Sequence, residues 1–334
     1  YPLLRRKRRG IKPSARINKF FIGGYMKKFI IVLSAVLMAT SSVVFAKAKE
    51  LKKLTFTYVT SPLNIPSIIE KDQKIFANEF KGTPVEYAEI TSGAEQTQAL
   101  ASGDVQILYA VGGSSVILSA ANGADIKVLN MYSRAPKAFC LYSKDASLNS
   151  PESLRGKKIA GPAGTNLHEL LTAYLASAGM KITDVSYVSM GIPAAKAALD
   201  GGSIDVALLA GAAAYNAGAQ GYHKITDGDG YIAAIIAVAT TEKFYKQNPD
   251  VIKKLASAQK KIANYIAKNK GQAFATTAKY LGLTDQAVKD MSAAYDFSTE
   301  LTQADMEGWQ KTADFMYASG MIDNKFDVKK LFIK

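Results

Sequence analysis

Short apolar runs alternate with helix-like segments along most of the chain. The runs that predict strands occupy residues 53–59, 84–90, 157–160 and 185–188. Each is followed by a loop of small residues, and then by a segment whose apolar positions recur at the spacing of an α-helix. Alternating strands and helices predict parallel sheets with helices on both faces, so the expected fold class is α/β.

A ten-residue pattern occurs twice. Residues 99–108 (ALASGDVQIL) and 198–207 (ALDGGSIDVA) share an Ala-Leu pair, a glycine and a following apolar run. In each copy we expect a short helix to end at a glycine in the left-handed conformation, with a strand after it. The elements before each copy also correspond, so the sequence predicts two similar, doubly wound α/β lobes.

The C-terminal third has a different pattern. Residues 250–268 and 303–319 carry apolar side chains at helical spacing, and the apolar run 232–239 predicts a buried strand before them. The simplest layout packs this tail onto the first lobe. The predicted boundaries are 47–137 plus 231–334 for lobe 1, 138–230 for lobe 2, and two crossings near Pro136–Lys137 and Gly228–Gly230.

The N-terminal segment has the pattern of an export signal. Two lysines at 27–28 precede the apolar run 29–38, and small residues stand at both ends of Val44–Ala46. The apolar core falls short of the ~20 residues that span a bilayer, so an uncleaved anchor is the weaker alternative. We predict a signal peptide over 26–46, a disordered upstream segment over 1–25 and a periplasmic mature protein.

The charge is concentrated in that leader. The net charge of +14 would suit a nucleic-acid binder, but residues 1–46 hold ten Lys and Arg residues and no acidic residue. The remaining chain has 32 basic and 28 acidic residues, a weak excess that predicts no nucleic-acid partner. A single cysteine excludes a disulfide scaffold and any zinc site that needs two thiolates.

The loops that follow the predicted strands are rich in small and hydroxyl residues. Ligands of parallel α/β sheets bind beyond the carboxyl ends of the strands, and a helix N-terminus there offers free N–H groups to an anion. The candidate ligand loops are 60–64, 91–93, 110–115, 161–166, 190–191 and 210–212. Glycines that only form tight turns are the alternative for each loop taken alone.

Two of these loops also carry helix-start signals. Ser92 precedes Glu95, and Asn166 precedes Glu169, at the spacing of a capping box. Ser92 is therefore both a candidate N-cap and a candidate ligand contact.

Arginine usage points to one further candidate. Beyond residue 46 the chain has 30 lysines but only two arginines, Arg134 and Arg155. Arg134 follows a predicted strand just before the first crossing, where its planar guanidinium could grip a carboxylate or sulfonate. An exposed or internally paired arginine is the alternative for Arg134, and a surface position is expected for Arg155.

No catalytic or metal-binding constellation is recognisable. His168, beside the loop 161–166, is expected on a helix surface, with a ligand contact as the weaker alternative. His223 is expected in a loop, and Cys140 as a small buried side chain. No loop matches a nucleotide-binding glycine motif. We assign no catalytic residue, no metal ligand and no cofactor.

Several of these motifs together resemble a known family. The carriers are the two A-L-x-x-G repeats, the run Gly156–Ala160 with Gly164–His168, and Ala120–Gly123 before a strand. The chain resembles the type II periplasmic solute-binding proteins of ATP-driven importers, in the nitrate, sulfonate and taurine group that also includes thiamine-precursor and riboflavin binders.

The resemblance implies two lobes that clamp a small solute and deliver it, as a monomer, to the membrane subunits of an ABC permease. It implies no enzymatic activity. It maps the ligand contacts to Ser61, Asn64, Gly112, Gly113, Ser114, Gly164, Thr165, Asn166, Gly191 and Tyr215. Tyrosine and the small run 210–214 favour an aromatic or vitamin-like solute, whereas Arg134 and the helix N-termini favour an anion, so the ligand stays open.

Two other functions remain as alternatives. One is an enzyme on the same scaffold that resembles the yeast pyrimidine synthase, although its cysteine-rich motif is missing here. The other is a ligand-sensing partner of a signalling protein.

Overall fold

The computed structural model describes residues 51–333, which lie within one compact unit. The predicted upstream segment and signal peptide fall outside the described residues. None of the helices formed by residues 51–333 combines the length and the apolar character needed to cross a bilayer.

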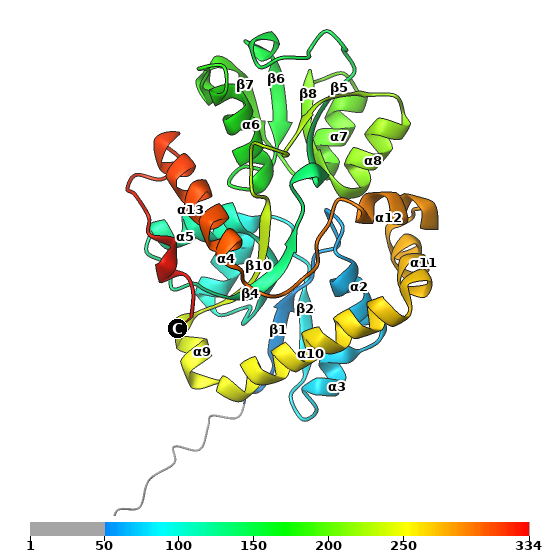
Figure 1. The fold of residues 1–334 in the computed structure, drawn as a ribbon, viewed down its shortest axis with the longest axis vertical. Helices are drawn as coiled ribbons and strands as arrows, with labels where there is room; N and C mark the ends of the chain where they lie inside the picture. The colour runs from blue at the N-terminus through cyan, green and yellow to red at the C-terminus, as the bar shows by residue number, and fades with distance from the viewer. Residues whose placement is uncertain (1–50, 334) are drawn as a thin grey trace, which may run out of the picture. The chain divides into compact units, whose positions relative to one another are not determined.

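Residues 139–227 build a five-stranded sheet with the order β7-β6-β8-β5-β9, which we call the upper part (Figure 1). Loops, two short 3-10 helices and three α-helices connect these strands. The elements are β5 (Phe139–Ser143), β6 (Lys158–Gly161), α6 (Asn166–Ala176), β7 (Ser186–Ser189), α7 (Ile192–Asp200), β8 (Val206–Ala210), α8 (Gly211–Ala219) and β9 (His223–Asp227).

The remaining described residues form the lower part, which holds a two-stranded sheet, β1-β2, and a three-stranded sheet, β3-β10-β4. An isolated parallel bridge between Phe56 and Ile107 links the two sheets. The elements before the upper part are β1 (Leu54–Thr57), α2 (Ile65–Asp72), α3 (Ile75–Glu79), β2 (Val85–Ala88), α4 (Gly93–Ser102), β3 (Leu108–Gly112), α5 (Gly113–Ala121) and β4 (Lys127–Arg134). Those after it are β10 (Ile235–Thr240), α9 (Glu242–Gln247), α10 (Pro249–Lys268), α11 (Lys270–Leu281), α12 (Asp285–Ser292) and α13 (Gln303–Ala318).

The strands are only partly parallel, which corrects the prediction of parallel sheets. The pairs β1–β2, β6–β7 and β6–β8 are parallel. Strand β5 is antiparallel to β8 and β9, and β10 is antiparallel to β3 and β4. A parallel pair needs a crossover, usually a helix, that returns the chain to the same end of the sheet. Strands β5 and β10 instead follow the two crossings between the parts, so they can run antiparallel to their neighbours.

The repeated pattern marks equivalent places in the two parts. In the lower part, α4 ends at Gly103, whose φ is 85°, and β3 follows. In the upper part, α7 ends at Gly201 with ordinary helical geometry, and the next residue, Gly202, takes the left-handed conformation with φ 71° before β8. The left-handed glycine is therefore one residue later than expected in the second copy.

The two tail helices pack by their apolar stripes, as predicted. Helix α10 buries Leu255, Ala258 and Ile262, and it lies across α2 and α3 (Figure 1). Burial of a leucine or isoleucine side chain contributes about 1.5–3 kcal/mol to folding. Helix α13 buries Trp309 and Met316, and Thr302 caps it in a capping box with Asp305.

The chain passes between the two parts at two adjacent segments. One joins β4 to β5 and contains Pro136; the other joins β9 to β10 and contains Gly228. The Gly228 N–H donates to the Pro136 carbonyl oxygen at 3.2 Å and to the Phe139 carbonyl oxygen at 3.0 Å. These bonds hold the two crossings side by side.

Candidate functional site

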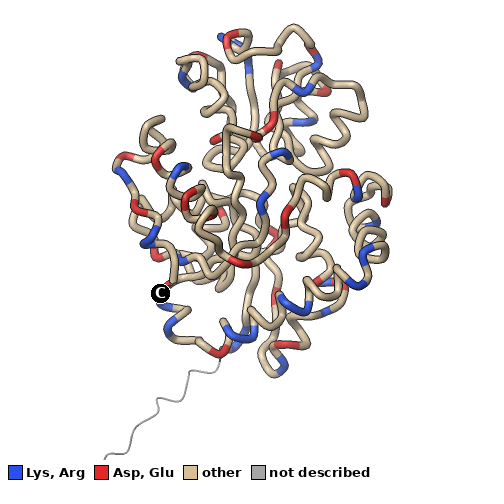
Figure 2. Tube along the Cα trace, viewed as in Figure 1, with Lys and Arg blue, Asp and Glu red and all other residues tan. Residues whose placement is uncertain are grey.

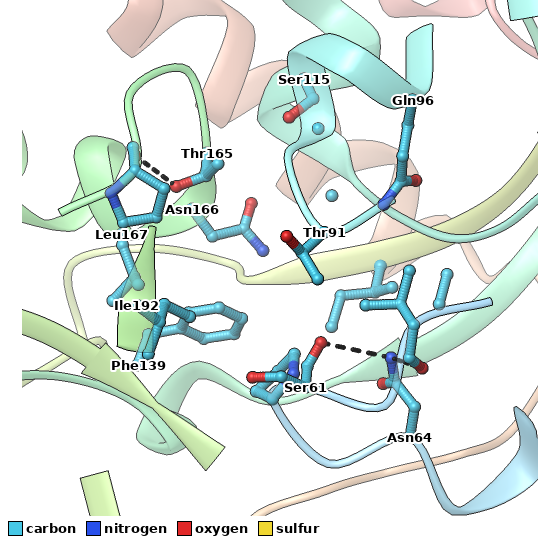
Figure 3. A pocket seen from close by; sticks show the side chains of 17 residues that line it. Ser61, Asn64, Thr91, Gln96, Ser115, Phe139, Thr165, Asn166, Leu167 and Ile192 are labelled. Carbon is cyan, nitrogen blue, oxygen red and sulfur yellow. Dashed lines mark hydrogen bonds between the residues drawn. The ribbon is translucent and has the colours of Figure 1, made fainter. Parts of the chain in front are cut away.

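The loops at the strand ends of the two parts surround a pocket of about 80 Å³ (Figure 3). The lower part contributes three loops and strand residues, and the upper part contributes the ends of β5, β6 and two helices. The lining consists of Val59, Ser61, Pro62, Asn64, Thr91, Gly93, Gln96, Ala110, Gly112, Ser115, Phe139, Pro162, Thr165, Asn166, Leu167, Ile192 and Ile236.

Five helices begin at this pocket, because each follows a strand whose carboxyl end faces it. Asn64 caps α2, Gly93 opens α4, Gly112 caps α5, Asn166 opens α6 and Ile192 opens α7. The first turns of these helices leave N–H groups without intrahelical partners and place positive dipole ends at the pocket. The local backbone therefore favours a negatively charged group.

The lining itself carries no charged side chain. Phe139, Leu167 and Ile192 form an apolar side in Figure 3, opposite the polar Ser61 and Thr91. The pocket thus has a polar side and an apolar side, as an anion with a short apolar tail would require.

Asn166 reaches into the pocket between these two sides (Figure 3). The residue is 3% exposed. Its oxygen Oδ1 accepts a hydrogen bond from the Ser114 hydroxyl at 2.8 Å. Its Nδ2 group forms no hydrogen bond with any other residue of 51–333. In this orientation of the amide, its nitrogen is free to donate in the pocket.

Two hydroxyl groups of α5 bind the upper part directly. The Ser114 hydroxyl contacts both Asn166 and Glu169, and the Ser115 hydroxyl donates to the Gly164 carbonyl oxygen at 2.7 Å. Ser114 is fully buried and Ser115 is nearly so. These contacts tie α5 to α6 beside the pocket.

Glu169 is the buried acid of this junction. It lies behind the pocket, among Gly113, Ser114, Trp309 and Thr312. Burial raises the pKa of Glu169 to about 6, against hydrogen bonds with Ser114 and Thr312 that lower it. The carboxyl group therefore carries a proton more readily here than in water.

A second contact between the parts needs a glycine. Gly211, the first residue of α8, has φ 61°, and a Cβ atom built on it would lie 1.8 Å from the Pro62 carbonyl oxygen. Pro62 belongs to the pocket lining. Only glycine fits this close approach, because any larger residue would collide with the backbone.

Two amide side chains brace the lower wall. Asn64 donates through Nδ2 to the Val59 carbonyl oxygen at 2.7 Å, and Gln96 donates through Nε2 to the Ile90 carbonyl oxygen at 3.0 Å. Their oxygens, Oδ1 and Oε1, are fully buried and have no hydrogen-bond partner among the described residues. Both amides are therefore oriented by the backbone.

Five of the residues predicted to contact a ligand lie in the pocket lining. That they bind a ligand remains a prediction. These are Ser61, Asn64, Gly112, Thr165 and Asn166. Five others lie beside it or behind it: Ser92 caps α4, Gly191 precedes α7, Gly113 and Ser114 lie in the junction with Glu169, and Gly164 accepts the Ser115 hydroxyl.

Arg134 and Tyr215 lie elsewhere, which corrects their prediction as pocket residues. Tyr215 lines a separate cavity between α8 and α12. The Arg134 guanidinium bonds both oxygens of Asp305, the Ser298 side chain and backbone, and the Glu300 carbonyl oxygen. All its donors are used inside the lower part, so none is free to grip a solute.

Asn166 is also not the N-cap that its spacing to Glu169 suggested. The N-cap of α6 is Thr165, and the Glu169 side chain turns to Ser114 rather than back to the helix start. Ser92, by contrast, caps α4 by accepting a hydrogen bond from the Glu95 N–H at 3.4 Å.

Sequence reasoning missed the apolar side of the pocket and part of its polar side. Phe139, Leu167, Ile192 and Gln96 lie outside the candidate loops, and Thr91 lies inside the candidate loop 91–93 without being named as a contact. Thr91, Leu167 and Ile192 directly adjoin predicted contacts in the chain, which is the one signal that could have found them.

The histidines and the cysteine do not line the pocket. His168 accepts a hydrogen bond from the Gly164 N–H at 3.2 Å through Nδ1 and stacks on Tyr187. Cys140 is buried, and burial raises the pKa of its thiol to about 12. Within residues 51–333, no three His, Cys, Asp or Glu side chains are grouped to hold a metal ion.

Comparison with known proteins gives relatives for most of the chain. A region of the chain is 32% identical over 209 residues to the taurine-binding periplasmic protein of Escherichia coli, covering 61% of this chain and 63% of that protein. A putative aliphatic sulfonates-binding protein of the same organism is 22% identical over 91% of this chain and 96% of its own length.

A solved structure shares the fold. The alkanesulfonate-binding protein of Xanthomonas axonopodis pv. citri, solved with bound MOPS, superposes with a TM-score of 0.78 at 20% identity and covers 86% of this chain and 99% of its own. The described unit therefore has the periplasmic binding protein fold. The family model described as NMT1/THI5 like matches residues 66–273, more than half of the sequence, and the chain belongs to that family.

Proposed function

We propose that this chain is the extracytoplasmic solute receptor of an ABC importer, and that it clamps a small organic sulfonate between its two parts. The observation that carries the proposal is the pocket itself, which is lined from both parts and has five helix N-termini around it. The names of the two Escherichia coli relatives, a taurine-binding and a sulfonates-binding protein, support the sulfonate.

In this proposal the upper and lower parts are the two predicted lobes, and the crossings at Pro136 and Gly228 are the hinge. The N–H groups at the helix starts and the Asn166 amide bind the sulfonate oxygens, while Phe139 and its apolar neighbours bind the carbon chain. Lys and Arg positions are interspersed with Asp and Glu positions along the described trace (Figure 2), which favours solute binding over binding of nucleic acid.

The same lining argues for binding without turnover. It contains hydroxyl and amide groups but no histidine, carboxylate or lysine that could serve a hydroxyl as a general base. We propose a periplasmic, monomeric protein that hands its unchanged solute to membrane permease subunits.

Isothermal titration of the purified protein with short organic sulfonates tests this function. We expect one bound solute per chain and unchanged solute on recovery. Small-angle scattering with saturating solute should show a smaller radius of gyration than without it. Absence of binding to every organic sulfonate tried would contradict the proposal, as would a chemically altered solute.

A further inference from the structure

A buried carboxyl group is connected to the pocket through two side chains. Glu169 contacts the Ser114 hydroxyl, which in turn bonds the Asn166 amide of the pocket lining. Resting on the proposed function, we infer that Glu169 is a positioning residue whose protonation decides which end of the Asn166 amide faces the solute. A protonated Glu169 turns N–H donors toward an anionic solute, and an ionised Glu169 turns the amide oxygen toward it.

The Ser114 hydroxyl has too few hydrogens for both of its partners. Its oxygen lies 2.8 Å from Asn166 Oδ1 and in contact with Glu169 Oε2. A serine hydroxyl carries one hydrogen, so it donates to one of these two groups and must accept a hydrogen from the other. Ser114 is fully buried, and Asn166 and Glu169 are each 3% exposed, so a missing hydrogen would cost free energy.

Two arrangements satisfy all three groups. In the first, the protonated Glu169 donates to the Ser114 oxygen, Ser114 donates to Asn166 Oδ1, and the Asn166 Nδ2 group faces the pocket, as in Figure 3. In the second, Glu169 has lost its proton and accepts from Ser114, whose oxygen then accepts from Asn166 Nδ2. The amide has turned over, and its oxygen faces the pocket. The two arrangements differ by the one proton that Glu169 releases.

No charged side chain in the surrounding elements offers Glu169 a different partner. The cavity beside it is lined by residues of α5, α6, β10 and α13, namely Gly113, Ser114, Ile117, Asn166, Ile235, Trp309 and Thr312. Helix α5 and strand β10 contain no charged residue. On α13, Asp305 bonds Arg134, and the other charged residues, Glu307, Lys311 and Asp314, are exposed. On α6 itself, His168 stacks on Tyr187.

The pH range of the change follows from this environment. Burial raises the pKa of Glu169 to about 6, against the hydrogen bonds with Ser114 and Thr312 that lower it. Below this value Glu169 is protonated and the Asn166 donors face the solute; above it the amide oxygen does. A sulfonate stays ionised on both sides of this value, so its affinity should fall as pH rises through it.

Titration with taurine and with ethanesulfonate at several pH values tests the inference. We expect the sulfonate to bind at least about tenfold more weakly at about pH 7.5 than at about pH 5, because an N–H donor facing the anion is replaced by an oxygen. Equal affinity at both pH values would overturn the inference and leave the proposed function intact. No binding of any organic sulfonate at either pH would overturn both.

Two variants separate the connection through Ser114 from the burial of Glu169 alone. Glu169→Gln keeps a donor for Ser114 at every pH, so its affinity should vary by less than about twofold over this range. Ser114→Ala removes the connection, so its pH dependence should shrink to less than about threefold. Burial alone predicts a steeper dependence in Ser114→Ala, because the lost hydrogen bond is one that lowers the pKa of Glu169.

Ser143→Ala is the matched control. Ser143 is also a buried serine, and its hydroxyl donates to the Asp205 carbonyl oxygen at 2.8 Å, at the opposite end of β5 from Phe139. This variant should keep the pH profile of the unmodified protein. His168 and Glu70 titrate in all four proteins, so their contributions cancel when the profiles are compared. An unchanged or steeper profile in folded Ser114→Ala would overturn the inference, as would a pH-dependent affinity in Glu169→Gln.

Discussion

At the scale of single residues, the pocket depends on side chains whose orientation other residues fix. Asn166 is the clearest case, because its amide bonds Ser114, a residue of the opposite part. The sequence marked Asn166 as a ligand contact but also as a helix cap, since its spacing to Glu169 fits a capping box. Local spacing cannot show that Glu169 instead reaches Ser114, which lies 55 residues earlier in the chain.

Replacement of Asn166 by aspartate should abolish the donor while keeping the size. We expect Asn166→Asp to weaken sulfonate binding by about 10- to 100-fold or more, because a charge-assisted hydrogen bond contributes about 1.5–3 kcal/mol and a repulsive carboxylate replaces it. The first turn of α6 tolerates an acidic residue, so the fold should remain. Calorimetric titration measures the loss.

Asn324→Asp, at an exposed position away from the pocket, is the control for the added charge. It should bind the solute as the unmodified protein does. Equal affinities of both variants would show that Asn166 does not touch the solute.

Arg134 illustrates a different outcome at the same scale. Burial alone would raise the pKa of Asp305, but hydrogen bonds from Arg134 and Thr302 outweigh it and hold this pKa at about 2. Asp305 is 171 residues away from Arg134, and a strand-end arginine looks the same in the sequence whether its partner is a solute or another segment.

We expect Arg134→Lys to lower the free energy of unfolding by about 2 kcal/mol, because lysine cannot reproduce the paired bonds to Asp305. Solute affinity should not change. Urea unfolding and titration measure the two effects separately.

The other arginine beyond residue 46 supplies the matched control. Arg155 pairs with Asp184 at 2.9 Å, but its side chain is 61% exposed, so Arg155→Lys should change stability by less than about 0.5 kcal/mol. A loss of sulfonate affinity in Arg134→Lys would restore Arg134 as a candidate contact.

At the scale of elements, the alternation of strands and helices was readable from the sequence, whereas the direction of two strands was not. Strands, helices and the repeated pattern follow from local apolar spacing, which the chain carries everywhere. Strands β5 and β10 run antiparallel to their neighbours because they follow the crossings, and no local pattern records which sheet end a crossing reaches.

The junction of α5, α6 and α13 should make stability depend on pH through Glu169. Its raised pKa means that the folded protein binds the proton more tightly than the unfolded chain does. This contribution to the free energy of unfolding therefore falls as pH rises from about 4.5 to about 6, and stays low above that range.

Glu169→Gln removes this titration. The variant should match the unmodified protein near pH 4 and be more stable by about 1–2 kcal/mol at neutral pH, as urea unfolding at several pH values would show. Glu70, whose pKa burial raises to about 7, titrates in both proteins and cancels in the difference. Glu95→Gln on the exposed side of α4 is the control, and a pH-independent difference would contradict the assignment.

At the scale of the whole molecule, the described structure has its two parts in contact around the pocket. The Ser114, Ser115 and Gly211 contacts join the parts, and all three involve residues that begin helices beside the pocket. The sequence predicted that loops from both parts meet, since ligands bind at strand ends, but it did not predict which atoms touch. That information depends on how two separately folded sheets approach each other.

A single methyl group should hold the parts apart. We expect Gly211→Ala to weaken solute binding at least about tenfold and to prevent compaction in small-angle scattering, because its Cβ would overlap the Pro62 backbone. Gly202→Ala has the same left-handed strain, with φ 71°, but no atom within 4 Å of its Cβ, so it should bind normally.

Both variants should lose about 1–2 kcal/mol of stability from the backbone strain alone. Normal affinity and compaction in Gly211→Ala would mean that the Pro62 contact is not needed for the bound state.

The bond between Ser114 and Asn166 has a consequence for how the solute leaves. Ser114 lies on the lower part and Asn166 on the upper part, so separating the parts breaks this bond, frees the amide to turn and moves the N-termini of α5 and α6 apart. The strength of binding at the pocket and the separation of the two parts are therefore coupled. In the proposed function, opening the two parts would therefore by itself loosen the site around the solute.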